Sequence, residues 1–416
     1  MTGVDRSRLA TLLARADIIA LLSVLNRDGD EARIIGGAVR NALIGEPVAD
    51  IDIATTCLPD ETARRARDAG FKAVPTGIEH GTVTIVIGGL PFEVTTLRCD
   101  VETDGRRAVV AFGRDFREDA LRRDFTINAL ALDGAGVLHD YAGGLADLEA
   151  RRVRFIGAAG ERIAEDYLRI LRFFRFHARY GAGEPDRAAL HACIAGRAGL
   201  DGLSRERVRA EFLKLLVAPR AAATLRAMAG AGLLMPVLGG APHLSRFAAI
   251  ADARGETVYP AFRLAALAVS VREDALRLRE RLRLSNAEFE RLSGIAAALE
   301  ALSGREARPG LATLRRLAQR IGTDAVAGGL VLLGRGDAAA DIQALIAELA
   351  RTPPFLPTGR DVLALGVGAG PKVGEVIEAA RAAWIDAGCP AGREAQIALL
   401  AEAVGREARR EPARTS

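Results

Sequence analysis

The amino-acid sequence predicts an α+β protein, with a mixed β-sheet in its first third and helices from there to the C-terminus. Two β-branched runs, Val83–Ile87 and Phe92–Leu97, and a short apolar run, Ala32–Ile35, have the length and composition of strands. From Glu161 to Leu349, Ala, Leu, Arg and Glu recur at helical spacing and strand-like runs disappear. A sheet followed by an all-helical region is the α+β arrangement.

The elements of the first third can be assigned in chain order. Residues Arg6–Leu25 carry apolar side chains at helical spacing, and the first predicted strand after them is stopped by Gly36 and Gly37. A second helix is expected to begin near Ala38. Further along, Gly88–Pro91 separates the two β-branched runs and predicts an antiparallel hairpin.

Composition and cysteine placement indicate a cytoplasmic protein that folds without disulfides. The chain has 416 residues, with 57 Lys and Arg against 53 Asp and Glu, and this slight basic excess is compatible with a polyanionic partner. Cys57, Cys99, Cys193 and Cys389 lie far apart and form no CxxC pair, so no zinc ribbon is expected. No run is long enough to cross a bilayer, and neither a membrane nor an obligate protein partner is expected.

The turn at Gly36 and Gly37 is a candidate anion-binding site. It joins a strand to the start of a helix, where backbone amides point outward and the helix dipole favours negative charge. A triphosphate bound there would lie against Gly37 and beside Arg40. A Gly-Gly turn also occurs as a plain connection between strand and helix, and this alternative stays open.

Asp50 and Asp52 are candidate metal ligands. Side chains alternate along a strand, so these two carboxylates would project from one face while Ile51 and Ile53 enter the core on the other. Neighbouring carboxylates repel each other, and Mg²⁺ relieves the repulsion because it prefers carboxylate and phosphate oxygens. A solvated strand edge is the alternative, and the glycine turn shortly upstream weighs against it.

Glu93 is the third candidate carboxylate. It is an acidic residue within an otherwise apolar and β-branched strand, and a strand beside the aspartate pair would bring it next to Asp50 and Asp52. Three carboxylates can hold two metal ions, one polarising an attacking hydroxyl group and the other gripping the triphosphate. Glu93 would ligate a metal or accept the hydroxyl proton; an exposed strand position is the alternative.

These residues belong to a series of motifs that resembles class II tRNA nucleotidyltransferases and bacterial poly(A) polymerases. The matching segments occur in the family's order and spacing, and they are Gly36–Arg40, Asp50–Thr55, Phe92–Arg98, Arg122–Ala129, Asp140–Gly144 and Glu165–Arg172. The chain departs from the family pattern at Asn41, where Asp is usual, and at Tyr167, where Pro is usual.

The resemblance implies a nucleotidyltransferase head of the polymerase β type followed by three helical domains. On this chain they would be a catalytic head at residues 1–138, a nucleotide-selecting neck at 139–200, a body at 201–350 and a tRNA-binding tail at 351–416. The proline-rich connector Thr352–Pro357 marks the last boundary. The implied cofactor is Mg²⁺, and the implied partners are tRNA, CTP and ATP.

Asp166 and Arg169 are candidates for choosing the base. Within a predicted helix Glu161–Tyr180, they fall along one side together with Arg172 and Phe176. Cytosine and adenine both present an amino donor beside a ring-nitrogen acceptor, so one acid and one arginine would admit C and A and reject U and G. A solvated helix face with an i, i+4 ion pair is the alternative.

The resemblance assigns this acid and arginine to a protein template and adds further contacts. The added nucleotide contacts are Arg123, Arg172 and Arg175, with Asp124 and Asn128 at the ribose. For Arg123 and Asp124, capping of the following helix is a structural alternative.

Full CCA addition is the activity that the resemblance favours. Cys99–Arg107 looks like the flexible loop of relatives that add the terminal A, and Val74–Thr82 lacks the basic run of tailing enzymes. Thr358–Gly374 is predicted to form a helix, a Gly-rich turn and a helix, which the family places against the tRNA elbow. Poly(A) tailing, partial addition and, from another class, small-molecule adenylylation are the alternatives. The histidines show no metal-ligand spacing, so no phosphohydrolase is expected.

Overall fold

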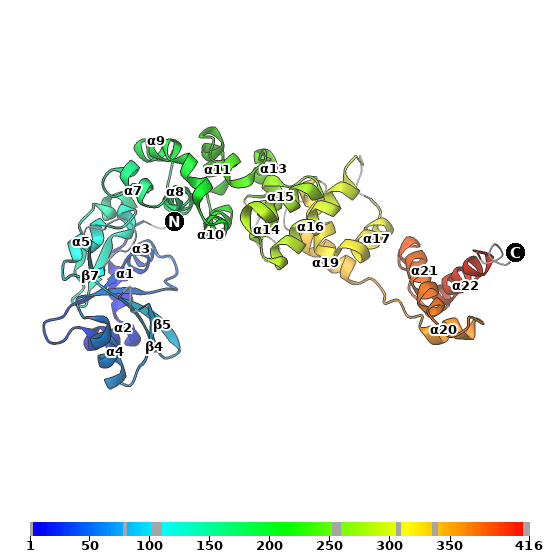
Figure 1. The fold of residues 1–416 in the computed structure, drawn as a ribbon, viewed down its shortest axis with the longest axis horizontal. Helices are drawn as coiled ribbons and strands as arrows, with labels where there is room; N and C mark the ends of the chain where they lie inside the picture. Colours follow the sequence, from blue (N-terminus) through cyan, green and yellow to red (C-terminus); the bar gives the residue numbers. More distant parts are fainter. Residues whose placement is uncertain are drawn as a thin grey trace. The chain divides into compact units, whose positions relative to one another are not determined.

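The chain divides into two compact units, Met1–Leu203 and Ser204–Ser416, in a computed structural model (Figure 1). The structure describes residues 3–77, 81–100, 110–251, 259–304, 309–334 and 340–410. Most of the predicted loop Cys99–Arg107 and part of Val74–Thr82 therefore lie outside the described residues. The finer division into head, neck, body and tail stays a prediction.

A seven-stranded mixed sheet forms the centre of the first unit, which confirms the predicted fold class. Its strand order is β3-β4-β5-β2-β1-β8-β9, and β2 and β5 run parallel while the other neighbours are antiparallel. The strands of this sheet are β1 (Ala32–Ile35), β2 (Asp52–Thr55), β3 (Lys72–Gly77), β4 (Thr82–Ile87), β5 (Leu90–Thr96), β8 (Leu130–Asp133) and β9 (Leu138–Asp140). A separate two-stranded ribbon consists of β6 (Arg98–Asp100) and β7 (Val110–Phe112).

Helices surround this sheet and extend the unit beyond it. They are α1 (Ser7–Leu13), α2 (Ala16–Leu25), α3 (Gly37–Ile44), α4 (Pro59–Asp68), α5 (Phe116–Leu121), η2 (Thr126–Asn128), α6 (Gly144–Glu149), α7 (Ala159–Glu165), α8 (Leu168–Tyr180), α9 (Arg187–Ala195) and η3 (Arg197–Gly202). Helices α2, α3 and α4 contact the sheet. Ile34, Ile53 and Val94 align across three neighbouring strands and are buried, so apolar burial fixes the strand register.

Three sequence-based element assignments are wrong in detail. The predicted helix Arg6–Leu25 is two helices, because Arg15 adopts an extended conformation between α1 and α2. Asp50 precedes β2 rather than lying within it, although Ile51 and Ile53 are buried as the alternation predicted. The predicted helix Glu161–Tyr180 is also interrupted, and this break matters for the site below.

The second unit is all-helical where the structure describes it, as the sequence predicted. Its helices are α10 (Arg205–Leu216), α11 (Ala221–Gly230), α12 (Leu234–Leu238), α13 (Leu244–Ile250), α14 (Pro260–Ala268), α15 (Arg272–Leu282), α16 (Asn286–Leu302), α17 (Leu311–Ile321), α18 (Thr323–Leu332), α19 (Ala340–Ala350), α20 (Gly359–Ala364), α21 (Lys372–Asp386) and α22 (Arg393–Arg410). Helices α20 and α21 confirm the predicted helix, turn and helix, with Pro371 immediately before α21. Among the described residues, no helix combines the length and hydrophobicity required to cross a membrane.

Candidate active site

The parallel pairing of β2 with β5 places Asp52 directly beside Glu93. In this register Ile53 pairs with Val94 and enters the core, so the two carboxylates project together from the opposite face of the sheet. Asp50 is exposed and lies two residues earlier, in the segment that leads into β2. The pairing of Asp52 and Glu93 is the adjacency that the sequence predicted.

The electrostatics of Asp52 reflect this crowding of acids. Although the residue reaches solvent, the protein atoms packed around its carboxyl group raise its pKa, and the charges of Glu93 and Asp50 raise it further. The guanidinium of Arg123 acts in the opposite direction and lowers it. Three acids and one arginine therefore influence one another here, and a cation bound among the acids would relieve their repulsion.

The glycine turn lies at the same end of β1 as this acidic group, because Ile35 pairs with Asp52. Gly36 has φ 66° and ψ −119°, a backbone conformation that residues with a Cβ rarely adopt. Helix α3 starts at Gly37, with its first amides at the turn. A β-carbon on Gly36 would lie 3.4 Å from an Arg123 terminal nitrogen, so Arg123 lies close to the turn, and its charge acts on Asp52.

Arg40 is buried and joins α3 to α8. Its guanidinium donates to the side-chain oxygens of Asn41 (3.0 Å) and Asn128 and to the hydroxyl of Tyr180 (2.7 Å). It also lies 4.1 Å from the centroid of the Tyr180 ring. Burial lowers the pKa of Arg40. The sequence placed Arg40 beside a bound triphosphate. The structure gives its guanidinium protein partners, and a direct phosphate contact stays a prediction.

Asp124 connects the Arg122–Asp124 motif to α8. One carboxylate oxygen accepts from the Asn128 amide group and the Phe125 backbone N–H, both at 2.9 Å. The other accepts from Arg172, with Nε at 2.7 Å. The structure thus brings together Asp124, Asn128 and Arg172, which the sequence suggested as nucleotide contacts.

Three arginine side chains lie around the buried ring of Phe176. The guanidinium carbons of Arg40, Arg172 and Arg175 lie 5.3, 5.4 and 4.4 Å from its centroid. Arg172 also forms an ion pair with the Asp124 carboxylate. A positive group on an aromatic ring is suited to a polyanionic ligand.

Asp166 lies in a break between α7 and α8, which corrects the prediction of one continuous helix. Its backbone is extended, with φ −156° and ψ 106°, and its carboxylate accepts from the Leu168 backbone N–H at 3.1 Å. This bond satisfies an amide at the start of α8. A β-carbon on Gly199 would lie 2.0 Å from the Tyr167 ring, so the ring packs directly on this glycine and holds the break in place.

Arg169 follows the break and is oriented by groups from α7. It donates to the Arg162 carbonyl at 2.8 Å and forms an ion pair with Glu165, which confirms the predicted i, i+4 pair. The pair spans the break rather than a regular helical turn. Asp166 in the break and Arg169 in the first turn of α8 are near neighbours, since the Arg169 backbone N–H donates to the Asp166 carbonyl at 3.0 Å. Their role in base choice stays a prediction.

Two residues of the site were missed by the sequence analysis. Asp119 is buried and accepts hydrogen bonds from both Arg122 and Arg123. The sequence carried a signal for it, since Asp119 precedes the arginines by three and four residues, the spacing of helical neighbours. Tyr180 binds Arg40 from 140 residues away, and no local pattern indicates such a contact.

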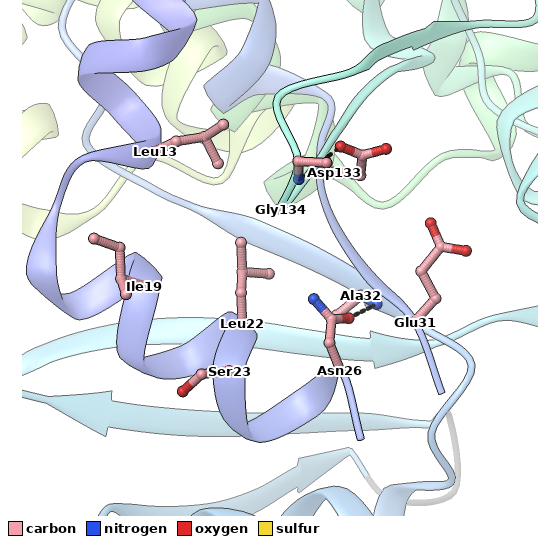
Figure 2. A pocket seen from close by; sticks show the side chains of 10 residues that line it. Leu13, Ile19, Leu22, Ser23, Asn26, Glu31, Ala32, Asp133 and Gly134 are labelled. Atoms are coloured by element: carbon pink, nitrogen blue, oxygen red, sulfur yellow. Dashed lines mark hydrogen bonds between the residues drawn. The ribbon is translucent and has the colours of Figure 1, made fainter. Parts of the chain in front are cut away.

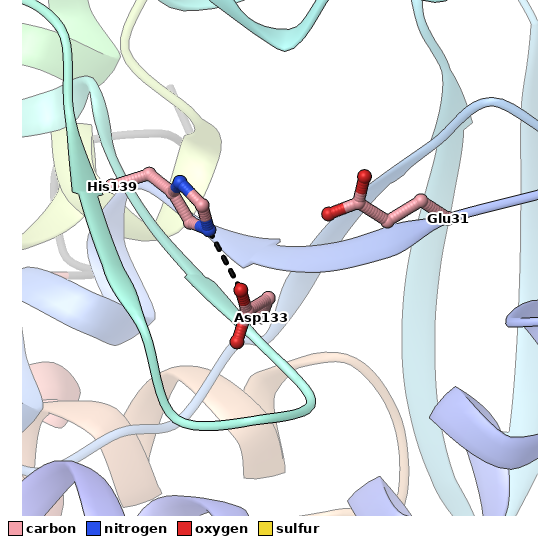
Figure 3. A group of neighbouring side chains, drawn as sticks. All are labelled: Glu31, Asp133 and His139. Carbon is pink, nitrogen blue, oxygen red and sulfur yellow. Dashed lines mark hydrogen bonds and ion pairs between the residues drawn. The ribbon is translucent and has the colours of Figure 1, made fainter.

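Among the described residues, the three side chains whose potential metal-ligating atoms lie close together are on the same sheet, at its β8–β9 side. Ligating atoms of Glu31, Asp133 and His139 fall within 4.8 Å of one another (Figure 3). His139 is 2.8 Å from Asp133, whose other oxygen accepts from the Val137 backbone N–H, and Glu31 accepts from Arg33 at 2.6 Å. Each of the three side chains therefore already has a protein partner.

A hollow of about 450 Å³ lies between α2 and the β8–β9 hairpin (Figure 2). Its apolar lining includes Leu13, Ile19 and Leu22. None of its lining residues belongs to the Asp52–Glu93 site.

Two protein-family models match the chain. Residues 32–154 match the "Poly A polymerase head domain", and residues 186–247 match the "Probable RNA and SrmB- binding site of polymerase A". The first match contains all three acids of the site and Arg123.

One of the named relatives matches most of the chain, and another matches about half of it. The chain is 34% identical over 388 residues to the mitochondrial CCA tRNA nucleotidyltransferase 1 of Mus musculus, which covers 89% of this chain and 86% of that protein. The match to the Danio rerio protein of the same name is 44% identical over 219 residues and spans about half of each, 52% of this chain and 51% of the relative. Among solved structures, the Bacillus stearothermophilus CCA-adding enzyme in complex with CTP superposes with a TM-score of 0.74 at 28% identity, covering 97% of this chain and 99% of that one.

Proposed function

Because this chain belongs to the family of CCA-adding tRNA nucleotidyltransferases and poly(A) polymerases, we propose that it adds CCA to the 3′ end of tRNA from CTP and ATP. The observation that carries the proposal is the paired acids Asp52 and Glu93 at the same end of the sheet as the Gly36 turn, with Arg123 beside that turn. The relatives named for CCA addition and the CTP-bound structural neighbour support the choice of reaction.

Mg²⁺ is the proposed metal. Asp50, Asp52 and Glu93 offer only carboxylate oxygens, the donors that Mg²⁺ prefers, and the raised pKa of Asp52 indicates acids that a cation would stabilise. Two such ions would polarise the attacking 3′-hydroxyl group of the tRNA and neutralise the triphosphate. Asp50 and Asp52 act as ligands, and Glu93 completes the set or accepts the hydroxyl proton.

The triphosphate is proposed to lie against the α3 amides at Gly37. Arg123 approaches the same turn, and Arg172 and Arg175 supply further positive charge from α8. Arg40 supports this arrangement by tying α3 to α8. These groups hold the nucleotide while the 3′-hydroxyl displaces pyrophosphate.

Base choice is proposed to rest on Asp166 and Arg169. The Asp166 carboxylate accepts from the amino group of C or A, and Arg169 donates to the adjacent ring nitrogen. U and G present a carbonyl and an N–H at these places, so each contact becomes repulsive or unpaired. The contact of Arg169 with Glu165 favours this use, since it restricts the direction of the guanidinium.

Single-nucleotide incorporation tests the proposal. Purified protein is incubated with Mg²⁺ and a tRNA lacking its 3′ end, with one labelled nucleotide at a time and then with CTP and ATP together. The expected result is two C residues from CTP and one terminal A that requires them. A long A tail would indicate poly(A) polymerase, addition of C alone or A alone would indicate a partial enzyme, and no transfer to RNA would contradict the proposal.

A further inference from the structure

Asp119 is a buried carboxylate shared by two arginines. It lies on α5 and is 4% exposed. One oxygen accepts from Arg122, with Nε at 3.0 Å, and the other accepts from Arg123, with the terminal nitrogen at 2.9 Å and Nε at 3.3 Å. Burial by itself would raise the pKa of Asp119, but the charges of Arg123 and Arg122 outweigh it and lower the pKa. The carboxylate is therefore held in its charged form by its partners.

The two arginines are oriented differently with respect to the nucleotide site. Arg123 uses Nε and one terminal nitrogen to bind Asp119, and its other terminal nitrogen is the one closest to Gly36. Its charge also acts on Asp52. Arg122 binds the same carboxylate through the other oxygen. Asp119 thus fixes one edge of the Arg123 fork and leaves the other edge directed at the glycine turn.

We propose that Asp119 is a positioning residue, which acts on nucleotide transfer by holding the Arg123 guanidinium beside the Gly36 turn. This inference rests on the proposed function. Without the carboxylate, Arg123 would lose two hydrogen bonds and rotate among several conformers, some of them directed at the acids of the metal site. Asp119 would then influence nucleotide binding without touching the nucleotide.

The test is a double-mutant comparison of Asp119→Asn and Arg123→Gln. Asparagine keeps the size of the side chain and removes the charge. Measured with CTP and a tRNA lacking its 3′ end, D119N is expected to lower kcat/KM about ten- to a hundredfold, mainly through a higher KM, because a bond to a charged group is lost. The ratio of C to U incorporation should not change, since Asp166 and Arg169 are untouched.

Non-additivity distinguishes positioning from general structural damage. If Asp119 acts through Arg123, the D119N/R123Q chain performs like R123Q alone. If D119N lowers kcat/KM by the same factor in the wild-type and the R123Q backgrounds, the proposal is overturned. Arg122→Gln is the matched control, because Arg122 shares the carboxylate; its kcat/KM should stay near wild type, and a loss as large as that of D119N would assign the effect to Arg122 instead.

Two further measurements keep the outcome unambiguous. Thermal unfolding of each variant shows whether it folds. If D119N does not fold, D119N/R122Q takes its place, because it removes the Arg122 guanidinium together with the Asp119 carboxylate. Its activity is then compared with that of R122Q. The wild-type chain tests the proposed function itself. If it transfers no CMP, the proposed function fails; if it transfers CMP and D119N has wild-type KM and kcat, only the role of Asp119 is refuted.

Discussion

At the scale of single residues, the site combines acids that repel one another with arginines that are held in place by protein partners. Asp52 and Glu93 are adjacent because two strands pair in parallel, and nothing in that pairing lowers their repulsion. By contrast, Arg40 and Arg172 each have a hydrogen-bond partner that lies at least 48 residues away in the sequence. Strand pairing in the sheet holds the acids together against their repulsion. Binding of a metal ion would relieve that repulsion.

Replacing either proposed metal ligand should abolish transfer. Asp50→Ala and Asp52→Ala each remove a ligand that stabilises charge in the transition state, and the expected loss in kcat is about a hundredfold or more. Both positions reach solvent, so the thermal unfolding temperature should stay near that of wild type. Asp68→Ala, which removes an exposed acid on α4, is the control and should keep full activity. Retention of more than about a tenth of the activity by D50A or D52A would contradict the assignment.

Replacing a template residue should relax base choice rather than slow every reaction alike. Asp166→Ala removes the acceptor for the amino group of C and A and also the repulsion toward the carbonyl of U and G. The discrimination lost is expected to be about 1–3 kcal/mol, or about ten- to a hundredfold. The measurement is kcat/KM for all four nucleotides on a tRNA that lacks CCA, with Arg169→Ala in parallel. A uniform decrease with an unchanged C-to-U ratio would mean that both residues only support the helix break.

At the scale of secondary-structure elements, α8 links the proposed nucleotide contacts to the core of the first unit. Its outer side carries the arginines, while Phe173 is fully buried and packs against Phe125, Phe155 and Phe174 at centroid distances of 6.4, 5.7 and 5.2 Å. This aromatic group fixes α8 beside the segment that carries Asp124 and Asn128.

Removing one ring from this group should destabilise the first unit. Phe173→Ala leaves a cavity and is expected to cost about 3–5 kcal/mol in free energy of unfolding. Denaturant unfolding monitored by circular dichroism measures it, and Val137→Ala, which truncates a side chain that is 53% exposed, is the control. A loss below about 1 kcal/mol for F173A would show that α8 is held mainly by its polar contacts.

At the scale of the whole molecule, each compact unit has a buried core, and each contains at least one buried cysteine whose reactivity can reveal unfolding of that unit. Cys57 and Cys193 lie in the first unit and Cys389 in the second. Burial raises the pKa of all three thiols above its ordinary value. At pH 8 a smaller fraction of each is therefore thiolate, the form that reacts.

The buried thiols should react only when the unit that contains them unfolds. In a Cys99→Ser chain at pH 8, a thiol reagent followed by mass spectrometry should label none of the three in native buffer and all three in denaturant. If Cys389 is labelled at a lower denaturant concentration than Cys193, the two units unfold separately. Rapid labelling of any of the three in native buffer would contradict their burial.

The sequence by itself determined the fold class, the strands β1, β4 and β5, and the family. Strand alternation in β2 buries Ile53 and turns Asp52 outward, and such short-range periodicity is set by backbone geometry. The hairpin predicted from its turn likewise formed as β4 and β5. These features depend on residues close to one another in the chain, so a local pattern is sufficient to reveal them.

Only the tertiary structure decided which partners hold the arginines and where the long helix breaks. Arg40 meets Tyr180, and Tyr167 packs on Gly199, because segments far apart in the chain fold against each other. The helical spacing around Asp166 favoured an unbroken helix, yet capping of α8 and the packing of the Tyr167 ring outweigh that weak local preference. Burial and partner choice depend on the whole packed unit, and for that reason the sequence pattern alone did not contain them.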